Sequence, residues 1–174
     1  MTSQQLIISG VGGQGILFVT RILAEAAIVR GLPVLTSETH GMAQRGGIVI
    51  SHFKVGDYSS PLVCPGRADG LISLKHETVA LHRHFLKPDG WTVANGPPGS
   101  LTGISALIDA DQLALGLGNA QSVNLIILGR VLAIPGLLFC TADEVEAAIR
   151  IKLSAKPEVL EGALAAFRIG LQHY

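Results

Sequence analysis

Residues 6–15 have the sequence LIISGVGGQG, in which a short apolar run is followed by a loop with four glycines. The apolar run is typical of a β-strand, and residues 16–30 place apolar side chains at helical spacing. Gly31 is a suitable end for that helix, and residues 33–37 form a second candidate strand. A strand–helix–strand unit of this length predicts two parallel strands joined by a right-handed crossover.

The segment after this unit departs from the alternation of strands and helices. Residues 38–47 are polar and contain three glycines, which predicts a loop. Residues 48–55 have a strand pattern that ends at a Gly-Asp turn signal, and residues 62–63 form a short candidate return strand. We therefore expect a β-hairpin insertion after the second strand.

Parallel βα units resume in the rest of the chain. The pattern predicts strands at 70–74, 91–94 and 105–108, a helix at 77–86, a turn at 88–90 and a loop at 95–103. Four helices follow, at residues 110–117, 123–133, 142–153 and 158–173. The sequence thus predicts an α/β fold: a single three-layer, mostly parallel, Rossmann-like sheet with a β-hairpin insertion and a helical C-terminus.

Composition excludes several classes of protein. The 174 residues include 13 Lys or Arg and 13 Asp or Glu, so the net charge is zero and the basic footprint of a nucleic-acid-binding protein is missing. No run of apolar residues is long enough to span a membrane, and the first residues lack a basic leader, so we expect a cytoplasmic protein. Because only 15% of residues are charged and 48% are hydrophobic, we expect an extensive core or a surface shared with a partner chain.

The glycine loop has two interpretations. Gly10, Gly12 and Gly15 match G-x-G-x-x-G between a strand and a helix, and Glu38 follows at the distance of a ribose-binding acid. That pattern favours a free-standing NAD- or FAD-binding module. A tight turn also requires glycine, so the loop is equally suited to a homo-oligomeric scaffold. Gln14 adds an amide that can donate and accept hydrogen bonds to a ligand or a neighbouring chain.

Five segments, in order along the chain, resemble one family. The loop at 10–15 is similar to the G-x-G-G-Q-G signature of the gamma subunit of 2-oxoacid:acceptor (ferredoxin) oxidoreductases. The segment at 37–47, SETHGMAQRGG, most resembles the small beta subunit of indolepyruvate ferredoxin oxidoreductase. Further similar segments are ADGLI at 68–72, LKPDG at 86–90 and NLIILG at 124–129. One departure is Ala163, where relatives carry Asn, although Ala166 and Gly170 fit the pattern around it.

The resemblance implies that residues 1–174 are one gamma-type domain and a subunit of an enzyme that is inactive alone. The holoenzyme of this family oxidatively decarboxylates aryl 2-oxoacids to acyl-CoA. Thiamine diphosphate and iron–sulfur clusters are expected in a large partner subunit that passes electrons to ferredoxin. The small subunit is expected to hold no cofactor, to help shape the pocket for substrate and CoA, and to form a homodimer when isolated. Its two cysteines, Cys64 and Cys140, are too few for a cluster.

The candidate site residues follow from the loops and the resemblance. No catalytic residue is assigned; Arg45 and His40 are candidates, the first as a clamp for a carboxylate or phosphate and the second as a proton donor. Alternatives are an ion pair for Arg45 and a backbone contact for His40. No metal site is expected. The residues expected to bind a cofactor or face the partner are Gly10, Gly12, Gly13, Gln14, Gly15, Glu38, Arg45, Gly46, Gly47 and Asn124.

Overall fold

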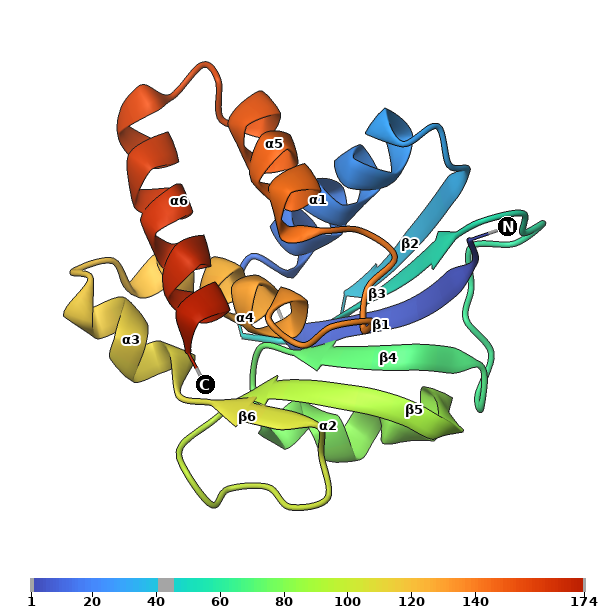
Figure 1. Ribbon diagram of the computed structural model, residues 1–174. Helices are drawn as coiled ribbons and strands as arrows, with labels where there is room; N and C mark the ends of the chain where they lie inside the picture. Colours follow the sequence, from blue (N-terminus) through green and yellow to red (C-terminus); the bar gives the residue numbers. More distant parts are fainter. Residues whose placement is uncertain (1, 41–45, 174) are drawn as a thin grey trace.

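A six-stranded sheet with the order β2-β3-β1-β4-β5-β6 forms the centre of the computed structural model, which describes residues 2–40 and 46–173 (Figure 1). The strands are β1 (Gln4–Val11), β2 (Val34–His40), β3 (Ile48–Val55), β4 (Ala68–Ser73), β5 (Leu86–Asn95) and β6 (Ala106–Ile108). The helices are α1 (Ile16–Val29), α2 (Glu77–His82), α3 (Ala110–Gly116), α4 (Val123–Leu132), α5 (Ala142–Lys152) and α6 (Pro157–Gln172), with short 3₁₀ turns at Arg83–Phe85 and Ala120–Ser122. The expected fold class is confirmed.

The inserted segment enters the sheet as a single strand, β3, between the first two strands. β3 is antiparallel to both β1 and β2, while β1, β4, β5 and β6 are parallel. The expected strand–helix–strand unit is therefore parallel, but its strands are not neighbours. β2 also extends through His40, so the loop expected from residue 38 begins later. The ladder with β3 explains this, since Glu38 is opposite Ser51.

Two further expectations are wrong. Residues 62–63 form no strand, and Pro88 and Gly90 lie within β5 instead of in a turn before it. The ladder between β5 and β6 is confined to Val93–Asn95, because β6 has only three residues. A proline is tolerated at position 88 because the ladder with β4 shifts register between the Ala68–Leu86 and Gly70–Trp91 pairs, so Pro88 has no ladder partner there. The helix expected at 77–86 is a single α-helical segment followed by the 3₁₀ turn.

Side chains alternate between two cores on the two faces of the sheet. In β1, Leu6 and Ile8 contact the core under α1 and α4, while Ile7 contacts a smaller core that includes Val79 of α2. This alternation is the two-residue period of a strand. The sheet therefore has a thick helical layer on one face and a thin layer, with α2, on the other. Within the described residues no helix is long and apolar enough to cross a membrane.

Helix α4 is buried on both sides. One side contacts β4 and β5, and the other contacts α6. A Cβ on Gly129 would lie 2.2 Å from the carbonyl oxygen of Phe167, and a Cβ on Gly170 would lie 2.0 Å from that of Ile126. The two helices therefore cross with their backbones in close contact, and glycine is required at both positions.

Candidate functional site

The candidate site lies at the carboxyl edge of the sheet, between β1 and β4. The chain leaves β1 through α1 on one face and leaves β4 through α2 on the opposite face. The helices that follow β1 and β4 thus cover opposite faces of the sheet, and the space between the ends of these two strands is a topological switch point. In open α/β sheets, ligands bind outside the carboxyl ends of the strands at such a switch point. The glycine loop after β1 and residues 74–77 after β4 emerge there.

Glycine is favoured at the positions of this loop for different physical reasons. A Cβ on Gly10 would lie 2.7 Å from Oε1 of Gln14, so packing excludes a side chain. Gly13 and Gly15 have φ angles of 94° and 80°, in the left-handed region that favours glycine. Gly12 is exposed, and the nearest atom to a Cβ there would be 3.6 Å away. Packing or backbone conformation therefore accounts for three of the four glycines, but not for Gly12.

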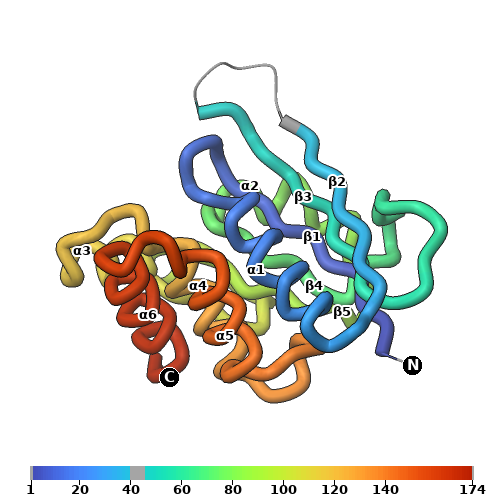
Figure 2. The backbone as a smooth tube through the Cα atoms, turned by 90° about the horizontal axis from the view of Figure 1, so that it is seen from above, coloured from blue at the N-terminus to red at the C-terminus, as the bar shows by residue number. Residues whose placement is uncertain are grey.

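The two glycine motifs meet at this edge. The backbone N–H of Gly12 donates a hydrogen bond to the carbonyl oxygen of Gly47, at 2.8 Å. Gly46 has a φ of 74° and is exposed beside this contact. Figure 2 shows the turn after β1 beside the start of β3. Gly12 and Gly47, which are 35 positions apart in the sequence, therefore belong to one surface.

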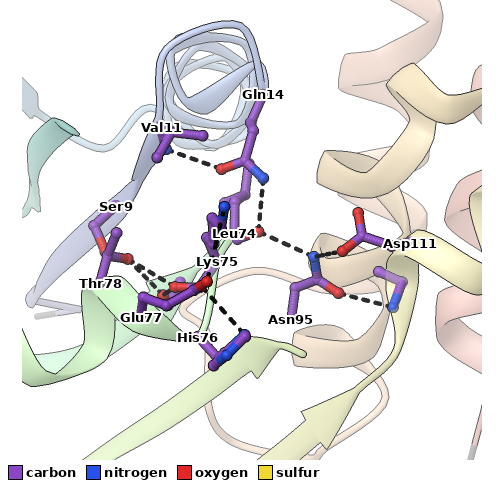
Figure 3. A network of polar contacts seen from close by, with 12 residues as sticks. Ser9, Val11, Gln14, Leu74, Lys75, His76, Glu77, Thr78, Asn95 and Asp111 are labelled. Atoms are coloured by element: carbon purple, nitrogen blue, oxygen red, sulfur yellow. Dashed lines mark hydrogen bonds and ion pairs between the residues drawn. The ribbon is translucent and has the colours of Figure 1, made fainter. Parts of the chain in front are cut away.

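Gln14 ties this loop to the end of β4 (Figure 3). Its Oε1 accepts a hydrogen bond from the Val11 N–H at 2.9 Å, and its Nε2 donates to the Leu74 carbonyl oxygen at 3.0 Å. The amide thus makes its bonds to backbone groups of this chain. An amide has further donor and acceptor capacity, so a contact to a ligand or partner chain stays a prediction.

The Leu74 carbonyl oxygen also accepts a hydrogen bond from a second side-chain amide, that of Asn95, which the sequence pattern did not reveal. Nδ2 of Asn95 donates to the Leu74 carbonyl oxygen at 3.1 Å and to Asp111 at 3.0 Å, while its Oδ1 accepts from the Ala110 N–H at 2.9 Å. Asn95 is 1% exposed. It joins the ends of β4 and β5 to the start of α3. An asparagine directly after the strand predicted at 91–94 was the available signal.

Three buried hydroxyls fix the turn after β4. The Thr78 hydroxyl lies 3.0 Å from that of Ser9 and 2.8 Å from that of Ser73. The Ser73 and Thr78 hydroxyls also lie 2.7 and 2.9 Å from the Lys75 carbonyl oxygen. The backbone of this turn is therefore held by side chains from β1, β4 and α2, and the sequence analysis missed this cluster.

Charged side chains cover the turn. Nζ of Lys75 lies 3.8 Å from Glu77, and Nδ1 of His76 lies 3.3 Å from the same carboxylate. Lys75 and Glu77 are about half exposed, so water screens the pair and it contributes little to folding. Figure 3 shows Lys75, His76 and Glu77 together with Gln14 in the network of polar contacts.

Asn124 lies behind the loop rather than on its open side. The residue is 7% exposed, and its Nδ2 is 3.5 Å from the Gly15 carbonyl oxygen. A Cβ on Gly15 would lie 2.2 Å from that nitrogen. Its Oδ1 accepts from the Leu125 N–H at 2.8 Å. Asn124 therefore satisfies local backbone groups and joins the starts of α1 and α4; a role toward a partner stays a prediction.

The remaining candidates are placed differently. Glu38 is exposed within β2, and β3 separates β2 from β1. Adjacent strands are about 4.8 Å apart, so the carboxylate is one strand further from the glycine loop than in a dinucleotide-binding unit. This argues against a ribose-binding role. His40 is the last residue of β2, and Arg45 lies outside the described residues.

Histidines and cysteines form no metal centre in the part of the chain that the structure describes. Cys64 is exposed, and Cys140 is buried, which raises its pKa to about 12. His82 and His84 lie near the end of α2, where burial lowers the pKa of His82.

Comparison with known proteins places the chain in a family. Residues 5–173 match the model of the pyruvate ferredoxin/flavodoxin oxidoreductase family. The indolepyruvate oxidoreductase subunit IorB of Archaeoglobus fulgidus is 30% identical over 95% of this chain and 92% of its own length. The corresponding subunit of Pyrococcus horikoshii is also 30% identical, over 99% and 96%.

Solved structures agree with this assignment. The gamma subunit of a keto/oxoacid ferredoxin oxidoreductase from Geobacter sulfurreducens has a TM-score of 0.74 and 27% identity, over 97% of this chain and 96% of that one. A 2-oxoglutarate:ferredoxin oxidoreductase from Magnetococcus marinus has the same fold in 30% of its chain, with a TM-score of 0.79 at 23% identity over 98% of this chain. The chain therefore belongs to the pyruvate ferredoxin/flavodoxin oxidoreductase family.

Proposed function

We propose that this chain is the small subunit of a thiamine-dependent indolepyruvate:ferredoxin oxidoreductase, and that residues 1–174 form its single gamma-type domain. The observation that carries the proposal is the match to indolepyruvate oxidoreductase subunits over nearly the full length of both chains. The reaction is the oxidative decarboxylation of an aryl 2-oxoacid to an acyl-CoA. The chain is inactive alone and works in the cytoplasm.

The redox cofactors belong to the partner in this proposal. An iron–sulfur cluster is held by about four thiolates, and this chain has two cysteines, one exposed and one buried. Thiamine diphosphate and the clusters are accordingly assigned to a large subunit, which passes electrons to ferredoxin. Coenzyme A is bound in the relative from Magnetococcus marinus, and we extend CoA use to the holoenzyme here.

The carboxyl edge of the sheet is the surface that we assign to the large subunit and its substrate. Gly12, Gly13 and Gly46 are exposed there, so backbone groups are accessible to another chain. The partly buried amide of Gln14 and the buried amide of Asn95 hold the edge in one arrangement, which limits the entropy lost on binding. Arg45 precedes Gly46 and supplies the cation for a carboxylate or phosphate.

The test is reconstitution with the large subunit. We expect the two chains to copurify, and we expect indolepyruvate-dependent reduction of an electron acceptor only when both are present and CoA is added. Gel filtration of the isolated chain checks the proposed homodimer. A large subunit that is fully active without this chain would contradict the assignment. So would activity of this chain alone.

A further inference from the structure

The thin layer on the α2 face leaves a groove that the family assignment does not explain. It has a volume of about 500 Å³ and lies between α2 with its 3₁₀ turn, the early part of β5, and the loop at 101–105. Figure 1 shows α2 and this loop together at the β5–β6 end of the sheet. β6 is too short to cover the first residues of β5, which is why the space stays open.

The groove has rigid walls. Val79 and Thr92, which line it, are each 5% exposed. The Thr92 N–H donates to the Ser105 hydroxyl at 3.2 Å, and the Ser105 N–H donates to the Thr92 carbonyl oxygen at 2.9 Å, so the loop is bonded to β5. A Cβ on Gly90 would lie 3.0 Å from Leu86, which keeps this wall flat.

The lining is more polar than apolar, and it carries positive charge. Leu86, Leu101 and Ile104 supply apolar surface, and hydroxyls come from Thr92, Thr102 and Ser105. None of the described lining residues is acidic. Lys87 is paired with Asp69, whose hydrogen bond raises the pKa of the lysine. Arg83 is exposed and makes no ion pair with any described residue, so it is the cation available to a ligand.

We propose that this groove binds a small organic anion with an apolar body, its carboxylate or phosphate on the guanidinium of Arg83. Ligand pockets occupy roughly 300–1,000 Å³, and this groove falls within that range with a lining that is more polar than apolar. Arginine binds both kinds of anion through paired N–H donors. Arg83 lies beside the start of β5, at the opposite edge of the sheet from the glycine loop, so this is a second site.

The test is a ¹H–¹⁵N chemical-shift titration of the full isolated chain, which does not depend on the proposed function. The probes are indole-3-acetate and phenylacetate for the carboxylate class and 4′-phosphopantetheine for the phosphate class. Acetate and inorganic phosphate, which lack an apolar body, are the matched controls. We expect saturable shifts at Val79, Arg83 and residues 101–105 with one class and weaker ones with its control.

Two variants test separately whether binding depends on the charge of Arg83 and on the volume of the groove. Arg83→Met keeps the side-chain stem and should weaken binding about tenfold or more. Ala80→Leu fills part of the groove on an exposed helix position and should abolish binding while leaving the fold intact. Arg21→Met, on α1 and the other face of the sheet, should bind as the unmodified chain does.

Several results would overturn the proposal. Absence of saturable shifts with both classes would do so, as would equal affinity in Arg83→Met and Arg21→Met. Shifts confined to residues 12–14 would place the anion at the carboxyl edge instead. Protection of residues 101–105 from hydrogen exchange by the large subunit, with no small anion bound, would identify the groove as a protein interface.

Discussion

The Gly12 N–H donates a hydrogen bond to the carbonyl oxygen of Gly47, and this bond brings the two glycine motifs of the sequence together. The motifs follow β1 and precede β3, which are adjacent antiparallel strands. The end of one strand therefore lies beside the start of the other. This arrangement makes the loops of this edge a single surface, and the predictions below separate its structural residues from its functional ones.

Gly15→Ala should destabilise the isolated chain. Gly15 has a φ of 80°, and a Cβ there would lie 2.2 Å from Nδ2 of Asn124. Strain of this kind costs about 1–3 kcal/mol. Gly12→Ala is the matched control in the same loop, because a Cβ there would make only ordinary van der Waals contacts; we expect a change within about 0.5 kcal/mol. Urea unfolding measures both, and equal stability of the two variants would contradict this account of the loop.

Gly129→Ala should destabilise the crossing of α4 and α6. The added Cβ would meet the Phe167 carbonyl oxygen at 2.2 Å, so the helices must separate. Overpacking of this kind costs typically 1–3 kcal/mol. Gly116→Ala, at the exposed end of α3 with no atom within 4 Å, should be neutral or stabilising by up to about 1 kcal/mol. Thermal unfolding compares the pair; a small effect at Gly129 would show that the helices are not in backbone contact.

Stability should fall as the pH drops below about 6.5. His52 is buried, and its Nδ1 accepts a hydrogen bond from the Val63 N–H at 3.1 Å. Burial and then the charge of Lys54 lower the pKa of His52 from its ordinary 6.5. The unfolded chain therefore binds a proton that the folded chain does not, so stability rises with pH up to about 6.5 and is lost below it.

Substitution should change this pH dependence. His52→Gln removes the titrating group, and we expect a shallower loss of stability between about pH 6.5 and pH 5. His82, whose pKa burial also lowers, accounts for a residual slope. His173→Gln, at the exposed end of the chain, is the control. Urea midpoints measured across the range would refute the assignment to His52 if the slopes of the variant and the control were the same.

The isolated chain should bind neither NAD nor FAD in the micromolar range. β3 lies between β2 and β1, so Glu38 is displaced from the glycine loop. Calorimetric titration of each dinucleotide into the chain measures this. Tight NAD binding that is lost in Glu38→Ala would instead favour the free-standing nucleotide-binding module.

The sequence predicts the elements that depend on local contacts along the chain better than those that depend on contacts between distant residues. The helices from α3 to α6 follow from local periodicity and are confirmed within about two residues. The place of β3 in the sheet is a long-range pairing that no local pattern encodes. Pro88 and Gly90 carry a turn signal, yet they are included in β5 because the residues on either side, Leu86 and Trp91, pair with β4. Tertiary contacts there override the local preference.

The residues of the candidate site likewise divide into those that a sequence pattern marks and those that it does not. Gly10, Gly13 and Gly15 carry a signal because their backbone or packing demands glycine. The Asn95 and Thr78 hydrogen bonds are between residues distant in the sequence or of types common in loops, so no motif marks them. Asn124 was singled out, but its contact with Gly15 is internal to the chain.

The central claim is that the carboxyl edge of the sheet faces the large subunit and its substrate. It is tested most directly by reconstituting Arg45→Ala and Gln14→Ala with the large subunit and measuring assembly and indolepyruvate-dependent turnover. Arg67→Ala, at the amino end of β4 and so at the opposite edge, is the matched control. We expect Arg45→Ala to fold normally and to lose about 1.5–3 kcal/mol of assembly or transition-state stabilisation, as for a charge-assisted hydrogen bond. Unchanged assembly and kinetics in both edge variants would contradict the account.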